Sequence, residues 1–196
     1  KKHENGENLK ARKKSENQEK SETAENSENL LTDWHQKAIT LQKNINQTIL
    51  GQEHIIDLMV VSIFCRGHIL LEGDVGVGKT TLIEIISSNT RSSLIKLNAV
   101  LSSIKELRTE IANAKERLLS SNRKTILFID EVHRFTSVQQ DALLPSIENG
   151  TITFIGATTE NPFFSVNKAL ISRARIFLLH PLNKDDLKKI IEKVIF

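Results

Sequence analysis

A run of eight residues has the composition of a loop that binds a polyphosphate. It reads Gly73-Asp74-Val75-Gly76-Val77-Gly78-Lys79-Thr80, and it fits the pattern G-x-x-x-x-G-K-[ST] at every position. Glycines let the backbone turn tightly, so that successive N–H groups can point at phosphate oxygens. We expect the Lys79 ammonium to reach the β and γ phosphates and the Thr80 hydroxyl to hold Mg²⁺. The run therefore predicts ATP and Mg²⁺ as ligands.

The surroundings of this loop match that chemistry. Residues 68–72 are apolar enough for a short buried strand, and a helix is expected to follow the loop. The N-terminus of such a helix adds a partial positive charge for the phosphates, and we place Thr81 in the same binding site. The alternative is a chance glycine turn before a helix. It is the weaker interpretation, because the phosphate-loop pattern is matched in full and lies between an expected strand and an expected helix.

A second motif is an apolar run that ends in two acids, Asp130 and Glu131. The run, residues 125–129, is typical of a central parallel strand that is buried on both faces. Carboxylates at the carboxyl end of such a strand lie where ligands bind in open α/β sheets. Asp130 is then placed to bind Mg²⁺, and Glu131 to orient and polarise the attacking water. A strand followed by Asp-Glu is common, so this motif indicates a nucleotide site only together with the phosphate loop that precedes it.

Composition sets limits on the class of protein. The chain has 196 residues and a net charge of +3, which permits nucleic-acid binding but fits a mixed solvated surface equally well. The single cysteine, Cys65, excludes a disulfide framework, and its apolar neighbours predict a buried thiol. No run approaches the ~20 apolar residues of a membrane span, and a signal-peptide core is missing from the first residues. We expect a cytoplasmic protein without a membrane partner.

The pattern along the chain predicts three parts, residues 1–29, 30–181 and 182–196. Residues 1–29 are polar and charge-balanced, which predicts a disordered tail. Residues 30–181 form the predicted α/β core: helices within 30–65, then strand and helix in strict alternation, and hence a parallel sheet with helices on both faces. The expected elements are strand 68–72, loop and helix 73–87, strand 94–98, helix 103–119, strand 125–130, helix 137–148, strand 152–157, helix 165–173 and strand 175–179.

Three details qualify this pattern. Ser103 and Glu106 have the spacing of a helix-capping box. Pro145 should kink or shorten the helix 137–148. Residues 182–196 begin another amphipathic helix with an apolar face, which we take as the start of a second, helical domain that the chain does not complete.

These residues together resemble the core of AAA+ ATPases, a group of P-loop NTPases. Four strings are more specific and are similar to the replication-associated recombination protein A (RarA) family: residues 128–135, 139–145, 150–162 and 169–175. That resemblance covers about residues 93–195, whereas residues 49–73 look more like the MoxR branch of AAA+ proteins. The phosphate loop also departs from the proline-containing loop usual in RarA-like proteins.

The resemblance implies roles for several residues. Thr158 corresponds to the sensor-1 position, whose polar side chain contacts the γ-phosphate or the attacking water, and Asn161 is a second candidate. Turn chemistry is the alternative for both. Arg173 corresponds to the arginine finger, which one subunit supplies to the ATP bound by its neighbour. The guanidinium neutralises charge on the transferring phosphoryl.

The remaining basic residues of these strings receive weaker roles. Arg175 is a lesser candidate for the finger, and its alternative is a solvated residue at the start of a strand. His133 and Arg134 are expected near the mouth of the site, with a surface role.

The resemblance implies an ATP-hydrolysing motor that acts in DNA replication, recombination or repair, at forks or single-strand ends, as a homo-oligomer. Two alternatives remain open: a MoxR-like chaperone ATPase that remodels protein partners, and a nucleotide-binding piece without turnover. The lid domain and its sensor-2 arginine are expected to be truncated, and the family's C-terminal oligomerisation region is likewise not recognisable.

Overall fold

The computed structural model describes residues 32–33, 35–46, 49, 52–90, 92–181, 183, 184, 186 and 188. Backbone contacts divide the chain into two units, Lys1–Thr40 and Leu41–Phe196. In the first unit the described residues 32–33 and 35–40 are helical, and the tail predicted for 1–29 lies outside the described part. Most of the helix predicted after residue 182, with its apolar face, also lies outside it. The fold described below is that of the second unit.

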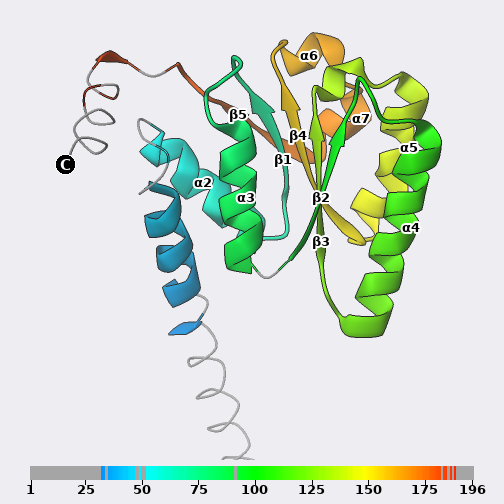
Figure 1. Cartoon of the computed structure of the whole chain (residues 1–196), viewed down its shortest axis with the longest axis horizontal. Coiled ribbons are helices and arrows are strands. Elements are labelled where there is room, and N and C mark those ends of the chain that lie inside the picture. Colours follow the sequence, from blue (N-terminus) through cyan, green and yellow to red (C-terminus); the bar gives the residue numbers. More distant parts are fainter. Residues whose placement is uncertain are drawn as a thin grey trace, which may run out of the picture. The chain divides into compact units, whose positions relative to one another are not determined.

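The second unit alternates strands and helices, as the sequence predicts (Figure 1). After helical residues 41–46, its elements are α2 (Glu53–Phe64), β1 (His68–Glu72), α3 (Lys79–Thr90), β2 (Ser93–Asn98), α4 (Ile104–Ser121), β3 (Thr125–Asp130), η1 (Val132–Arg134), α5 (Ser137–Glu148), β4 (Ile152–Thr158), α6 (Pro162–Ser165), α7 (Lys168–Ile171) and β5 (Ala174–Leu178).

The strands form one parallel sheet in the order β2-β3-β4-β1-β5. Because all strands run the same way, their carboxyl ends lie along one edge of the sheet. Four of them end there in polar residues: Glu72, Asn98, Asp130 and Thr158. Ligands of open α/β sheets bind outside this edge, so the topology brings the two predicted motifs to the same side. The predicted α/β class, with a parallel sheet and helices on both faces, is confirmed.

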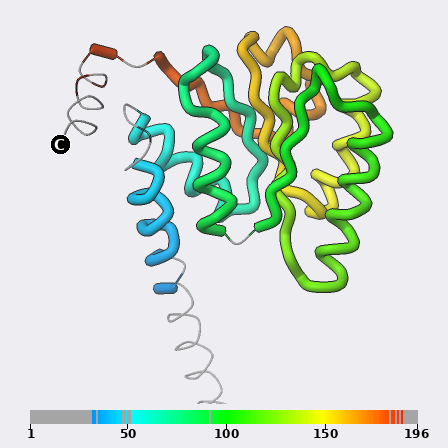
Figure 2. Tube along the Cα trace, in the orientation of Figure 1, coloured from blue at the N-terminus to red at the C-terminus, as the bar shows by residue number. Residues whose placement is uncertain are grey.

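Helices cover both faces of the sheet. Figures 1 and 2 show α2 and α3 on one face and α4 and α5 on the other. Under α4 and α5, Leu107 and Leu143 pack with sheet residues such as Leu127 and Phe154 in one buried cluster. Every residue of β3 from Thr125 to Ile129 is buried. Burying a large apolar side chain contributes roughly 1.5–3 kcal/mol to the stability of the fold. The buried side chains therefore hold β3 in place, and with it the residues at its carboxyl end.

Side-chain caps define the starts of two helices on this face. Ser103 accepts a hydrogen bond from the Glu106 N–H at the start of α4, so the serine half of the predicted capping box is present. Thr136 and Gln139 form a full capping box at the start of α5, which the sequence analysis missed. Helix α5 runs through Pro145 to Glu148, so the proline does not shorten it.

Two expectations are wrong. The helix predicted over 165–173 is replaced by the short helices α6 and α7, because Asn161 and Asn167 each cap a new helix start and Val166 between them is extended. Cys65 is exposed rather than buried. It lies at the C-cap of α2, just before Arg66 turns the chain with a positive φ, whereas Met59 and Val60 earlier in the same apolar run are buried.

Candidate nucleotide-binding site

The glycine-rich loop connects β1 to α3, and its backbone requires glycine. Gly76 and Gly78 have φ of +86° and +90°, a region that residues with a Cβ rarely adopt. Gly73 is needed for space, because a Cβ there would lie 2.9 Å from the backbone oxygen of Leu179. The glycines that match the sequence pattern are therefore explained by the loop's own geometry.

The Lys79 ammonium lies where this loop meets the end of β4. It donates hydrogen bonds to the backbone oxygens of Gly73 (2.5 Å), Asp74 (3.3 Å) and Thr158 (3.5 Å). Lys79 is buried, and the Gly73 N–H also donates to the Thr158 oxygen. All three partners of the ammonium are neutral carbonyls. A phosphate would offer this buried cation a partner of opposite charge.

The candidate magnesium ligands lie at the two ends of the site. Thr80 and Thr81 are exposed on the first turn of α3, and Asp130 is half-buried at the end of β3. Nowhere in the described part of the chain do three or more His, Cys, Asp or Glu residues gather to hold a metal. One carboxylate and one hydroxyl are nevertheless a suitable protein contribution to Mg²⁺, which keeps several waters and takes phosphate oxygens as its other ligands.

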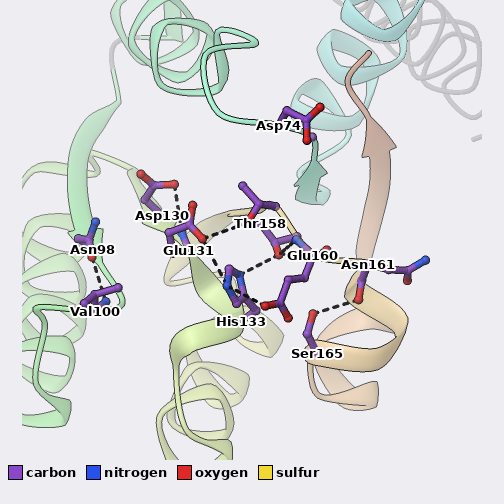
Figure 3. A network of polar contacts seen from close by, with 12 residues as sticks. Asp74, Asn98, Val100, Asp130, Glu131, His133, Thr158, Glu160, Asn161 and Ser165 are labelled. Carbon is purple, nitrogen blue, oxygen red and sulfur yellow. Dashed lines mark hydrogen bonds and ion pairs between the residues drawn. The ribbon is translucent and has the colours of Figure 1, made fainter. Parts of the chain in front are cut away.

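Glu131 begins the segment that follows β3, and its backbone is unusual. Its φ of 54° and ψ of 41° lie in the left-handed region, which costs roughly 1–3 kcal/mol for a residue with a side chain. This turn directs the carboxylate back along the carboxyl edge of the sheet (Figure 3). There its Oε2 lies 3.3 Å from Thr159 Oγ1 and 3.3 Å from His133 Nε2.

Two consecutive threonines at the end of β4 have different surroundings. Thr158 is fully buried, and its hydroxyl contacts His133 Nδ1 at 2.9 Å and both backbone groups of Glu160. Thr159 is exposed, and its hydroxyl donates to Glu131. The family resemblance points to Thr158 and not to Thr159. Its only sequence signal is its place directly after a strand that ends at the same edge as β3.

The surface role expected for His133 is wrong. Its side chain is 4% exposed, and it contacts Thr158, Glu131 and Glu160 (Figure 3). The short helix η1 turns the chain back under the end of β4, which buries the ring. Arg134, in contrast, is exposed, as expected. Asn161 caps α6 by accepting from the Phe163 N–H, which is the turn chemistry given as its alternative role.

The structure does not bring Arg173 to this cluster of side chains. The guanidinium donates to Ala169 O at 2.8 Å, to Ser172 Oγ at 3.1 Å and to the Glu148 carboxylate at 2.5 Å. Arg175 is exposed on β5. Within one chain, the residues that meet are therefore Lys79, Glu131, His133, Thr158 and Thr159.

Comparisons with known proteins find a matching family model and several similar relatives. Residues 69–182 match the family model of the ATPase family associated with various cellular activities (AAA). Replication-associated recombination protein A of Escherichia coli is 46% identical over 154 residues, which cover 76% of this chain and 34% of that protein. ATPase WRNIP1 of Dictyostelium discoideum is 38% identical over 180 residues, covering 87% of this chain and 20% of that protein. The predicted resemblance to the RarA family is thus confirmed.

A solved structure shows the same fold. The RuvB Holliday junction branch migration motor of Thermotoga maritima superposes with a TM-score of 0.60 at 28% identity, over 77% of this chain and 52% of that one. The chain spans about a third of the length of the RarA protein it matches. In the described residues, no helix has both the length and the apolar character needed to cross a membrane.

Proposed function

The chain belongs to the AAA family of ATPases, and from this we propose that it binds ATP with Mg²⁺, hydrolyses it, and works on DNA in replication, recombination or repair. One observation carries the proposal: Thr158 joins the two halves of the site. Its backbone oxygen accepts from Lys79, and its hydroxyl contacts His133, which contacts Glu131. The phosphate-binding lysine and the water-activating carboxylate thus meet at one strand end.

Each residue has a role in this proposal. Lys79 and the backbone N–H groups of residues 73–78 bind the phosphates, where Lys79 exchanges its carbonyl partners for phosphate oxygens. Thr80 and Asp130 hold Mg²⁺, which neutralises charge on the transferring phosphoryl. Glu131 orients the attacking water, and a threonine hydroxyl at the end of β4 senses the γ-phosphate. Of the two candidates there, the buried Thr158 and the exposed Thr159, Thr159 has the more accessible hydroxyl.

Arg173 requires a second copy of the chain in this proposal. Its contacts within the chain are with α7 and Glu148 rather than with Lys79 or Glu131. A guanidinium delivered by a neighbouring subunit would complete the charge neutralisation. We therefore propose a homo-oligomer in which residues 30–181 form the ATPase core and residues 182–196 begin a helical lid.

The test is ATP hydrolysis in the presence of Mg²⁺, with and without forked DNA, for the wild type and Glu131→Gln. We expect turnover that forked DNA stimulates and that the variant loses, while the variant still binds ATP. The relatives named for recombination and branch migration favour the DNA assignment. Turnover that DNA leaves unchanged would favour the protein-remodelling alternative. The resemblance of residues 49–73 to MoxR proteins supports that alternative. A wild type that binds ATP without turnover would overturn the hydrolysis proposal.

A further inference from the structure

The ring of His133 lies between a buried hydroxyl and two carboxylates. Its Nδ1 is 2.9 Å from Thr158 Oγ1. Its Nε2 is 3.3 Å from Glu131 Oε2 and 3.6 Å from Glu160 Oε1. We propose that His133 is a positioning residue for Glu131, and that the carboxylates of Glu131 and Glu160, which face Nε2, select the tautomer in which His133 does this while Thr158 contacts Nδ1. The inference rests on the proposed function, because it concerns the carboxylate that activates water.

The hydrogen bonds of Thr158 restrict the ring. The Glu160 N–H donates to Thr158 Oγ1 at 3.0 Å and so occupies one of its lone pairs. The hydroxyl has one proton to donate, either to His133 Nδ1 or to the Glu160 backbone oxygen at 3.1 Å. When it donates to Nδ1, the proton of a neutral ring is on Nε2. In this arrangement Nδ1 accepts from Thr158 and Nε2 donates toward the two carboxylates.

The opposite neutral tautomer is unfavourable. A proton on Nδ1 would leave the Nε2 lone pair facing the carboxylates of Glu131 and Glu160. In this side chain, which is 4% exposed, little water is available to relieve that repulsion. A doubly protonated ring is compatible with the site, because Thr158 can then turn its proton to the Glu160 oxygen. Both compatible states therefore carry a proton on Nε2.

This proton holds one particular oxygen of Glu131. The contacts of the carboxylate with His133 and Thr159 both end on Oε2. A carboxylate held by two donors at one oxygen cannot rotate freely, so the other oxygen, Oε1, keeps a defined direction. Glu131 also starts from a strained backbone, and without the ring its side chain would have more freedom to turn. His133 thus fixes the oxygen that accepts from the attacking water.

Three variants separate this role from a merely structural one. His133→Gln retains an N–H within reach of the Nε2 position, whereas the shorter His133→Asn keeps a polar group only on the Thr158 side. Thr158→Val preserves shape and removes the hydroxyl. For His133→Asn we expect kcat to fall about 10- to 100-fold, the range found when an orienting partner is removed. Gln should recover much of this loss, and the affinity for a fluorescent ATP analogue should change less than about twofold in both His133 variants because no phosphate ligand is altered.

A measurement without turnover tests the tautomer directly. Long-range ¹H–¹⁵N spectra of the histidine rings in the full chain should show a proton on Nε2 of His133 in the wild type. Thr158→Val should leave the proton on Nε2, because the carboxylates of Glu131 and Glu160 still face that nitrogen. Observation of the Nδ1–H form in the wild type would overturn the proposed arrangement, even if a variant failed to fold.

The same experiments separate this inference from the proposed function. If the wild type hydrolyses ATP and His133→Asn has the same kcat, the positioning role is wrong while the ATPase proposal stands. If the wild type does not hydrolyse ATP, the ATPase proposal is wrong and the positioning role in hydrolysis falls with it, while the spectra still decide how the ring is held.

Discussion

Arg173 Nη2 lies 2.5 Å from Glu148 Oε1, so the candidate arginine finger is paired within its own chain. The two side chains are 37% and 52% exposed, and ion pairs of this exposure contribute only about 0–1 kcal/mol. Arg173 also bonds to the end of α7, which orients the guanidinium. A weak pair of this kind holds the side chain in place and still lets it exchange the carboxylate for a phosphate.

The first prediction concerns Arg173 as a group that acts in trans. Arg173→Ala should bind ATP with unchanged affinity and lose most of its turnover, because the guanidinium stabilises charge only during phosphoryl transfer. Arg175→Ala, which removes an exposed arginine from the adjacent strand β5, is the matched control and should keep its turnover. Mixing Arg173→Ala with Lys79→Ala subunits should restore part of the activity. Equal loss in both arginine variants would count against the assignment.

The second prediction concerns Lys79. Lys79→Ala removes the buried ammonium that bonds to Gly73, Asp74 and Thr158, and ATP affinity should fall at least tenfold, or about 1.4 kcal/mol. Lys96→Ala, which removes an exposed lysine paired with Glu84, should bind ATP like the wild type. Titration calorimetry of the two variants decides the point, and normal ATP binding by Lys79→Ala would show that the loop is not the phosphate site.

The third prediction concerns the space at Gly73. A methyl group there would lie 2.9 Å from Leu179 O and 3.1 Å from Leu179 Cβ. Gly73→Ala should therefore destabilise the fold by roughly 1–3 kcal/mol, as overpacking does, and weaken ATP binding by shifting the loop. Urea unfolding measures the first effect. A variant as stable as the wild type would mean that β5 and the loop move apart at little cost.

The motifs that the sequence predicts best are those made by neighbouring residues. The phosphate loop and the Asp130–Glu131 pair need only a strand before them, and the alternating pattern places both strands in one parallel sheet. The burial of His133 and the contact of Thr159 with Glu131 could not be predicted in this way. His133 contacts Thr158, 25 residues away, and Thr159 contacts Glu131, 28 residues away, so both depend on how η1 packs against the end of β4.

The wrong expectations have a similar cause. The stretch predicted as helix 165–173 has helical apolar spacing, but Asn167, which caps the start of α7, interrupts it. Apolar neighbours suggested a buried Cys65, yet the helix ends one residue before it. In both places a single polar or turn residue overrides an apolar pattern.

The last prediction concerns His68 and pH. The ring lies at the start of β1 and accepts a hydrogen bond from the Phe154 N–H at Nδ1, which requires a neutral nitrogen. Burial lowers the pKa of His68, and a hydrogen bond to the Ile147 backbone opposes this only in part.

In the unfolded chain histidine titrates near pH 6.5, so below that pH the unfolded state binds a proton that the folded state resists. The contribution of His68 to stability is therefore complete above about pH 6.5, and it is lost as the pH falls through the lower pKa of the folded state. His68→Asn, whose amide oxygen can accept from Phe154, should flatten the dependence of the free energy of unfolding on pH below about 6.5. Urea unfolding across this range checks it, with His54→Asn on the exposed side of α2 as the matched control. Identical pH slopes for the wild type and His68→Asn would show that the buried ring does not contribute to acid sensitivity.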